Sequence, residues 1–506
     1  MAQQLQNIVI SAPAFKGLNT QDSPLTSDPS FAAVADNCVI DKYGRIGARK
    51  GFDTLTTTNL SELGGEPIVA MGYFEDETGN TKIFSAGNNK IISGTTALVD
   101  ETPAAYSISN DNWKMVNFNN KMYFFQRGQS PLVYDNANGL LEITSHPDNV
   151  GTPQNANEVI GAFGRLWCAD ITNDKQTVYW SDLLQGVAWS GGTSGFINVS
   201  KVWPDGYDEI VALAAHNNFL VIFGKHSIIV YQGAESPANM VLHDTISGLG
   251  CIERDSVQST GADILFLSHT GLQSFGRLIQ GGSLPMRDIS KNVRDDFMKL
   301  VNEETGNLKS VYSPENAFYL ITLPTKQITF CFDMRGALED GSHRVTTWTV
   351  TPFLAFVRQD NGVLLGGNTN GVGQYSGYLD NSGTYQLRYY SNPLTFGDSS
   401  RIKILKKIIP AVIAGGATLV KIQWGYDFSQ TLAVDYLQVP AILPAEYNIN
   451  EYSLSEYSSS SQKFIKKSIN ATGNGTLVTV GVQVDVNDEE FSLQEFNIQA
   501  LFGRIV

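Results

Sequence analysis

The sequence predicts an all-β protein with two parts. The first is a β-propeller, with seven blades favoured and six as the alternative, and the second is a β domain built from both chain ends. One strand–turn–strand unit recurs seven times between residues 68 and 376, and successive units start 40 to 54 residues apart. This period, with about four strands in each unit, is typical of propeller blades. Residues 384–506 contain longer alternating strands, which predict a different kind of sheet.

The N-terminal segment, residues 1–62, is rich in Pro, Asp, Ser, Thr and Gly. Its best helix candidate is Asp28–Asn37, because Asp28 suits the N-cap and the following proline suits the first helical position. A turn at Asp41–Gly44 and a basic strand at Arg45–Lys50 follow. We assign this segment, together with the C-terminal residues, to the second β domain.

The repeat region, residues 63–383, supplies the propeller. Each copy has an apolar strand, a break rich in Gly, Asn, Asp or Pro, and a second strand that often ends near an aromatic residue. The seven copies are Lys82–Ser93, Met122–Asp135, Leu166–Asp182, Phe219–Tyr231, Ile264–Phe275, Phe318–Asp333 and Val363–Tyr375. Their strands lack clean alternation, which is typical of burial on both faces, and closing them into a ring leaves only short edges. A large β-sandwich shares the turn chemistry, but it has no reason to keep one period seven times.

The C-terminal region, residues 384–506, predicts sheets with one face on a core and one in water. Strict alternation runs through Leu419–Trp424, Thr476–Val484 and Phe491–Gln499. The Ser- and Tyr-rich stretch 452–462 lies between two of these strands and is expected to be a loop.

Composition limits the function classes. Hydrophobic residues make up 42% and charged residues 17% of the 506 residues, as in ordered globular proteins. The net charge of −15 is concentrated in the repeat region, which has 20 basic and 33 acidic groups, while each end segment carries −1. An acidic propeller disfavours a surface that grips nucleic acid. Four scattered cysteines predict no disulfides, and we expect neither a signal peptide nor a membrane-spanning segment.

A search for catalytic motifs predicts no enzyme, no cofactor and no metal site. Ser181–Trp189 nearly matches the sialidase Asp-box, but the aspartate is displaced and the motif occurs once. Val178–Asp182 resembles the Tyr-Trp-Thr-Asp signature of lipoprotein-receptor propellers, again once. Both are interpreted as aromatic packing within a blade. His226 and His269 fall at repeat turns, where surface histidines are the simpler interpretation.

Two basic clusters are the candidate contact sites with other subunits or partner proteins. The segment Arg401–Ile409 is either a solvated edge strand whose lysines block aggregation or a binding strand, with Arg401 and Lys403 on one face. If it binds, acidic neighbouring subunits suit it better than DNA. The candidate contact residues are Arg45, Arg49, Lys50, Arg401, Lys403, Lys406 and Lys407.

The order of several segments resembles the tail nozzle proteins of short-tailed bacteriophages, also called tail tubular protein B. The resemblance is carried by Phe15–Thr20, Ala35–Asn37, Asp41–Gly44, Arg49–Gly51, Gly164–Ala169, Val178–Asp182, Phe266–Leu272 and Ile422–Asp427. It implies a homohexameric ring that is attached through the head-to-tail adaptor to the portal and contacts tail fibre or tail tip proteins. It also implies a virion protein, assembled in the host cytoplasm, whose ring retains and conducts genomic DNA during ejection without reading its sequence.

By the same resemblance we expect the end-derived β domain to form the ring and adaptor contacts, with the propellers outward or towards the tip. The alternative function is a propeller glycosidase or a carbohydrate-binding tail module that acts on host surface polysaccharide. That function needs clustered carboxylates at strand ends and aromatic sugar platforms, whereas the carboxylates here are dispersed.

Overall fold

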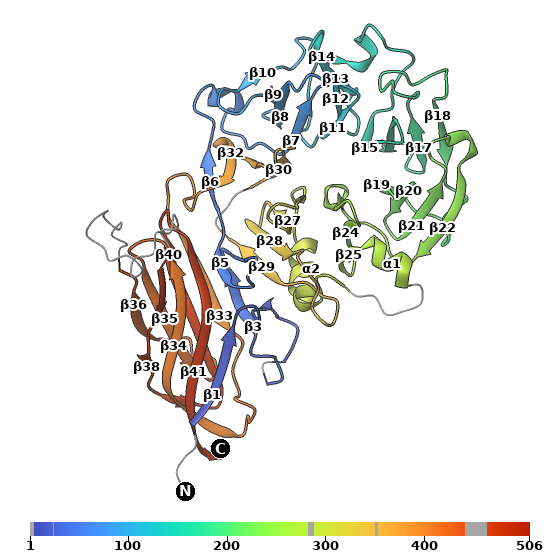
Figure 1. The fold of residues 1–506 in the computed structure, drawn as a ribbon. Helices are drawn as coiled ribbons and strands as arrows, with labels where there is room; N and C mark the ends of the chain where they lie inside the picture. Colours follow the sequence, from blue (N-terminus) through green and yellow to red (C-terminus); the bar gives the residue numbers. More distant parts are fainter. Residues whose placement is uncertain (1–4, 24, 282–287, 350–352, 441–462, 506) are drawn as a thin grey trace, which may run out of the picture.

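The computed structural model describes residues 5–23, 25–281, 288–349, 353–440 and 463–505 (Figure 1). Blade-like sheets follow one another around a ring, and a second β domain lies beside one part of the ring. Strand dominates and helix is scarce in the described residues, so the all-β class and the propeller are confirmed. No helix in the described part of the chain is long and apolar enough to cross a membrane.

The first four blades are four-stranded antiparallel meanders. Their strands are β7 (Ala70–Glu75), β8 (Thr81–Gly87), β9 (Lys90–Ser93) and β10 (Val99–Asp100); β11 (Lys114–Phe118), β12 (Lys121–Phe125), β13 (Leu132–Asp135) and β14 (Gly139–Glu142); β15 (Ala156–Ala162), β16 (Arg165–Ile171), β17 (Thr177–Trp180) and β18 (Gly195–Asn198); β19 (Ile210–His216), β20 (Phe219–Gly224), β21 (Ser227–Gln232) and β22 (Val241–Ser247). Asn-Asn pairs with positive φ turn three of these hairpins, at 88–89, 119–120 and 217–218. Asparagine tolerates this left-handed backbone, which matches the twist of the flanking strands.

The remaining sheets of the ring differ from one another. The next has three strands, β23 (Gln258–Ser259), β24 (Ile264–Ser268) and β25 (Gly271–Ser274), and continues into helix α1 (Phe275–Gly281). Helix α2 (Arg294–Asn302) precedes the sheet of β26 (Lys309–Ser313), β27 (Phe318–Leu323), β28 (Ile328–Asp333) and β29 (Val345–Trp348). The ring therefore has six four-stranded blades, which is the alternative blade count of the sequence analysis, and the fifth repeat, Ile264–Phe275, forms a shorter sheet of three strands between two of them. The sequence analysis did not predict α1 or α2.

The ring closes with a strand from the N-terminal segment. The last blade consists of β30 (Ala355–Arg358), β31 (Leu364–Asn368), β32 (Gly371–Ser376) and β6 (Gly51–Thr54), and β6 pairs antiparallel with β32. Residues 51–54 were assigned to the second domain from sequence, so that boundary is corrected. The fourth strand of the blade comes from over 300 residues away, and local patterns carry no information about such a pairing.

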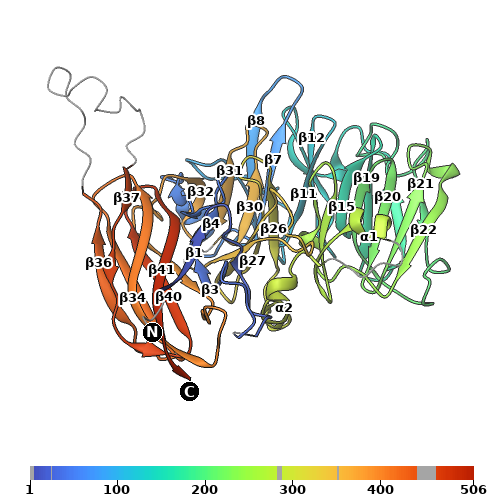
Figure 2. The ribbon, with the colours of Figure 1, turned by 60° about the horizontal axis from the view of Figure 1, so that its bottom comes forward.

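The second domain is a sandwich of two sheets (Figure 2). The eight-stranded sheet contains β1 (Leu5–Ser11), β4 (Cys38–Ile40), β5 (Ile46–Ala48), β34 (Arg401–Ala414), β37 (Lys463–Lys466), β38 (Ile469–Asn470), β39 (Asn474–Gly475) and β41 (Phe491–Ile505). The facing strands are β2 (Gly17–Leu18), β3 (Phe31–Asp36), β33 (Tyr385–Ser391), β35 (Leu419–Tyr426), β36 (Ala433–Gln438) and β40 (Val478–Val486). These six continue the β26–β29 blade through β29, so one ten-stranded sheet belongs to both domains.

The helix expected at Asp28–Asn37 is wrong. Phe31–Asp36 forms strand β3, which pairs with β2 and β29 in parallel and with β33 antiparallel. Asp28 instead accepts a hydrogen bond from the Ser30 amide and forms an ion pair with Lys16. Tertiary pairing on both sides of the segment outweighs its weak helical signals.

Packing of the alternating strands confirms their expected one-sided burial. Val480, Val482 and Val484 of β40 are buried between the two sheets. They belong to the same core as Ile408 and Ile498 of the eight-stranded sheet. Short 3₁₀ turns complete the described elements: η1 (Leu60–Leu63), η2 (Ile143–Ser145), η3 (Pro237–Asn239), η4 (Arg254–Ser256) and η5 (Lys291–Val293). The expected loop 452–462 lies outside the described residues.

Candidate functional site

A buried cluster of charged residues joins the inner strands of the propeller. Arg254 in η4 donates hydrogen bonds to Asn112, before β11, and to Asn157 in β15, at 2.6–3.3 Å. It also forms a two-point ion pair with Asp255, at 2.7 and 2.9 Å. Lys309 of β26 donates to both Asp255 and Asn112. One guanidinium and one ammonium group thus connect the turn η4, the loop before β11, and strands β15 and β26.

Two carboxylates of this cluster have opposite pKa shifts. Burial alone would raise the pKa of Asp255, but the cations of Arg254, Lys309 and Lys114 lower it far below its usual range. Burial raises the pKa of Glu158 to about 7, although Lys114 and Arg254 act in the opposite direction. The Nζ atom of Lys114 lies 3.9 Å from Glu158 Oε2, and this oxygen has no hydrogen-bond partner among the described residues. Divergent carboxyl pKa values are also a feature of acid–base sites.

The cavity beside the cluster argues for a structural role. Trp113, Lys114, Asp255, Lys309 and Ser310 are among the residues that line a space of about 140 Å³. Ligand sites usually have volumes of roughly 300–1,000 Å³, so this space suits a few water molecules better than a sugar. Asp255 forms ion pairs with Arg254 and Lys309, and Lys114 lies 3.9 Å from Glu158, so the charges that border the space already have partners within the chain. The cluster therefore fastens the blades together at the inner strands.

The N-terminal candidate contact residues lie at the joint between the domains. Arg49 is fully buried, and its guanidinium binds both carboxylate oxygens of Asp380 at 2.8 and 2.5 Å. It also lies 4.0 Å from the ring centre of Tyr385. Arg49 is therefore an internal anchor, and the expectation that it contacts another subunit or the adaptor is wrong.

The other two N-terminal candidates are partly buried. Arg45 stacks on Tyr43 at 4.3 Å and lies 3.8 Å from Asp41. Lys50 lies 4.0 Å from the ring centre of Tyr378; burial lowers its pKa, while Glu490 acts in the opposite direction. Both side chains thus have partners within the chain, although parts of them remain accessible.

The C-terminal basic strand is not an edge strand. β34 pairs with β41 on one side and with β37, β38 and β39 on the other, so the edge interpretation is wrong. Lys403 is buried and donates to the carbonyls of Asp398 and Thr476, whereas Arg401 is exposed. A register shift between these two residues breaks the alternation that would have put both on one face.

A second shift in β34 leaves Lys406 and Lys407 exposed side by side. Neither side chain forms an ion pair within the described part of the chain. Of the seven candidates, these two and Arg401 are the ones whose side chains are exposed.

The motifs set aside in the sequence do serve packing. The tilted rings of Trp180 and Trp167 pack together with their centres 5.3 Å apart, and Asp182 accepts hydrogen bonds from the Leu183 and Thr193 amides that shape a turn. His226 and His269 stack on each other at 5.1 Å at turns of neighbouring sheets. In the described ranges, no group of three or more His, Cys, Asp or Glu residues is arranged to hold a metal ion.

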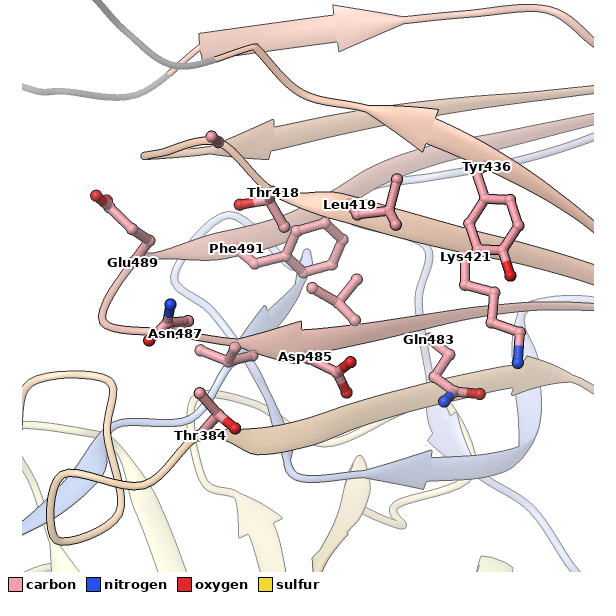
Figure 3. Close-up of a pocket in the computed structure, with 13 residues that line it drawn as sticks. Thr384, Thr418, Leu419, Lys421, Tyr436, Gln483, Asp485, Asn487, Glu489 and Phe491 are labelled. Carbon is pink, nitrogen blue, oxygen red and sulfur yellow. The ribbon is translucent and has the colours of Figure 1, made fainter.

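A cavity of about 450 Å³ in the second domain opens beside the outer face of the ten-stranded sheet (Figure 3). Lys421, Tyr436, Gln483 and Asp485 from three adjacent strands line it, and Thr418, Asn487 and Glu489 lie at its loop end. An exposed aromatic ring beside amide, ammonium and carboxylate groups is a surface that can bind polar ligands. The cavity was not predicted, because its residues are spaced along separate strands and form no motif.

Comparison with solved structures finds WD40 domains among the matches. The structure is similar to the WD40 domain of Pan2 from Neurospora crassa, with 7% identity, a TM-score of 0.36, and coverage of 62% of this chain and 92% of that chain. It is also similar to the WD40 domain of Toxoplasma gondii coronin, with 9% identity, a TM-score of 0.34, and coverage of 67% and 87%.

PorZ of Porphyromonas gingivalis is another structural match, with 10% identity, a TM-score of 0.35, and coverage of 76% of this chain but 46% of that one. No protein-family model matches the sequence, and no curated protein matches it either. These matches carry no information about the function of this chain.

Proposed function

We propose that this chain is a structural virion protein of a short-tailed bacteriophage. In this proposal its copies form the tail nozzle, a ring below the portal and adaptor that retains and conducts DNA during ejection. The observation that carries the proposal is the ten-stranded sheet that joins a propeller to a β domain made from both chain ends. A ring component must transmit load between domains, and a shared ten-stranded sheet with a buried ion pair at the joint suits that role.

Charge distribution supports the same proposal. The repeat region carries −13, while residues 1–62 and 384–506 carry −1 each. Nearly neutral end segments can approach identical copies without strong like-charge repulsion. Acidic propellers repel the phosphate backbone, so DNA passing nearby makes few Lys or Arg contacts that must be broken stepwise. A homohexamer is the oligomer that the family resemblance implies.

The adaptor contact is proposed for the second domain. Lys406, Lys407 and Arg401 are its exposed cations on β34, and they suit an acidic surface on a neighbouring protein. The proposed adaptor contact also includes Arg45 and Lys50, because parts of their side chains remain accessible.

The proposal is tested in virions. Mass spectrometry of purified particles of the phage that encodes the chain should find it as a stoichiometric tail component, and labelled antibody should mark the tail in electron micrographs. Particles assembled without the chain should have filled heads that lose DNA. Its absence from purified particles contradicts the proposal.

A second candidate is a carbohydrate-binding tail module, which the 450 Å³ cavity favours. Tyr436 offers an aromatic face, and Gln483 and Asp485 offer hydrogen-bonding groups to hydroxyls. Binding of purified chain to host surface polysaccharide, measured by calorimetry and lost on Asp485→Asn, would support this candidate. In this second candidate the module binds polysaccharide without hydrolysing it. Hydrolysis of polysaccharide that depends on Glu158 would contradict this.

A further inference from the structure

The second domain has two open strand edges on opposite sides. β1 forms the edge of the eight-stranded sheet and pairs with β41, whereas β36 forms the end of the ten-stranded sheet and pairs with β35. No other described strand pairs with either of them. In both views β36 lies at the outer left of the domain and β1 lies towards its other side (Figures 1 and 2).

The register identifies the backbone groups that face outwards on β1. The amide of Ala12 donates to Gln494 O, and the pairing continues without a shift to Leu5. Because donors alternate along an antiparallel pair, the N–H groups of Leu5, Asn7 and Val9 point away from β41. These groups form one free row along the edge.

The same argument applies to β36. The amide of Val439 donates to Thr418 O, and the register with β35 is regular from Leu419 to Trp424. The N–H groups of Val434, Tyr436 and Gln438 therefore face away from β35. The Tyr436 amide donates to Asp435 Oδ1 at 2.7 Å, so a partner strand must displace this local contact. Each strand presents a row of outward-facing donors and acceptors of about 20 Å.

Neither edge has the usual protection against pairing. Edge strands of monomers are commonly shortened, bulged, or marked by Lys or Pro. β1 has no charged residue, β36 has only Asp435, and neither contains a bulge, Lys or Pro. Leu5 and Val9 are 48% and 49% exposed, and Val434 and Tyr436 are 39% and 49% exposed. By contrast, β10 is two residues long, and the pairing of β22 with β21 contains a bulge.

We infer that β1 of one copy pairs with β36 of the next copy, so that the sheets of adjacent copies join head to tail. This inference rests on the proposed ring and names its contact. A second copy is the favoured partner because each chain supplies both edges, of seven and six residues, with no like charges between them. Two different surfaces on opposite sides of one molecule generate a closed ring or a filament rather than a two-fold dimer.

The test uses the full chain and two proline variants. Val9→Pro and Val434→Pro each remove an outward N–H group, so neither breaks a hydrogen bond within the chain. Native mass spectrometry and light scattering over a concentration series should show oligomers for the wild type and monomers for each variant. An equimolar mixture should form a 1:1 dimer that does not grow, because one intact β1 and one intact β36 remain.

Val9→Lys and Val434→Lys form a second pair of edge variants. They replace the proline variants if an altered circular dichroism spectrum shows that a proline disturbs the fold. Leu183→Lys is the matched control, since Leu183 is an exposed leucine in a propeller turn and should leave assembly unchanged. Oligomers that survive both edge substitutions, a mixture that stays monomeric, or a wild type that never associates would each overturn the inference. Virion localisation is a separate readout, so a failed edge contact leaves the proposed function to be judged on its own test.

Discussion

Arg49 and Asp380 form a two-point ion pair across the joint between the domains. The two N–O distances are 2.8 and 2.5 Å, and the arginine side chain is completely buried. Arg49 also donates to Asn37 Oδ1 at 3.1 Å and to the carbonyl of Lys50 at 2.9 Å. One side chain therefore ties strands of the N-terminal segment to the chain that leaves the last blade.

Replacing this arginine should destabilise the joint. Arg49→Met leaves the partly buried Asp380 carboxylate without its cation, so we expect the free energy of unfolding to fall by about 3–5 kcal/mol. Urea denaturation followed by tryptophan fluorescence measures the change. Arg504→Ala, an exposed arginine near the C-terminus, is the control and should change stability by less than about 0.5 kcal/mol. Equal stability of the two variants would show that the joint does not depend on the ion pair.

The inner-strand cluster should behave as one unit. Arg254→Leu removes the bonds to Asn112, Asn157 and Asp255 and leaves the Asp255 carboxylate with Lys309 and Lys114. We expect a loss of about 3–5 kcal/mol for this buried partner. Hydrogen exchange should also increase in the inner strands β11, β15 and β26 together. An increase confined to η4 argues against a shared cluster.

Glu158 should make stability depend on pH. Its pKa is raised from 4.5 to about 7 in the folded chain, so the native state keeps a proton that the unfolded state loses at lower pH. The native state binds more protons between about pH 4.5 and 7, and stability therefore decreases as pH rises through this window. The full loss is up to about 3 kcal/mol for such a shift.

Glu158→Gln should flatten this part of the stability curve, because glutamine does not titrate. Urea midpoints measured from pH 4.5 to 8 give the comparison, and the exposed Glu77→Gln should keep the wild-type slope. A Glu158→Gln curve parallel to that of the wild type contradicts the assignment.

Gly51 should be essential for closing the ring. A Cβ atom there would lie 1.9 Å from the carbonyl oxygen of Leu379, and the two next nearest atoms are also backbone. Gly51→Ala should therefore displace β6 from β32, cost about 1–3 kcal/mol, and expose the last blade to limited proteolysis. Gly336→Ala, where a Cβ has no neighbour within 4 Å, should leave the digestion pattern unchanged. A resistant Gly51→Ala chain would falsify the closure by β6.

The same closure affects fragment design. A fragment that starts at residue 63 lacks β6, and its last blade has three strands. We expect a propeller fragment that includes residues 51–54 to be more resistant to proteolysis than one that omits them. Thermal unfolding of the two fragments, compared side by side, checks this expectation.

Much of the propeller could be predicted because its signal is local. Each hairpin such as Phe219–Tyr231 combines an apolar run, a turn and a second apolar run within a dozen residues. The structure has β20 and β21 there, and both are almost entirely buried. Because these strands are buried on both faces, apolar and polar residues need not alternate along them, and in this hairpin they do not.

The candidate contact residues were less predictable. Arg49 and Lys403 look like surface cations in the sequence, but both are buried with oxygen partners from distant segments. The inner-strand cluster draws Asn112, Glu158, Arg254 and Lys309 from four separate segments, and no spacing along the chain brings them together.

Apolar periodicity and turn residues act over a few positions, so the β class, the repeated hairpins and the one-sided strands of the C-terminal region could be predicted from the chain alone. The folded structure was needed to show that Phe31–Asp36 is a strand, that β6 closes the ring and that one sheet spans both domains. These features depend on backbone hydrogen bonds between segments more than 300 residues apart. Such a pairing is selected by the free energy of the whole fold, and the residues on either side carry no local sign of it.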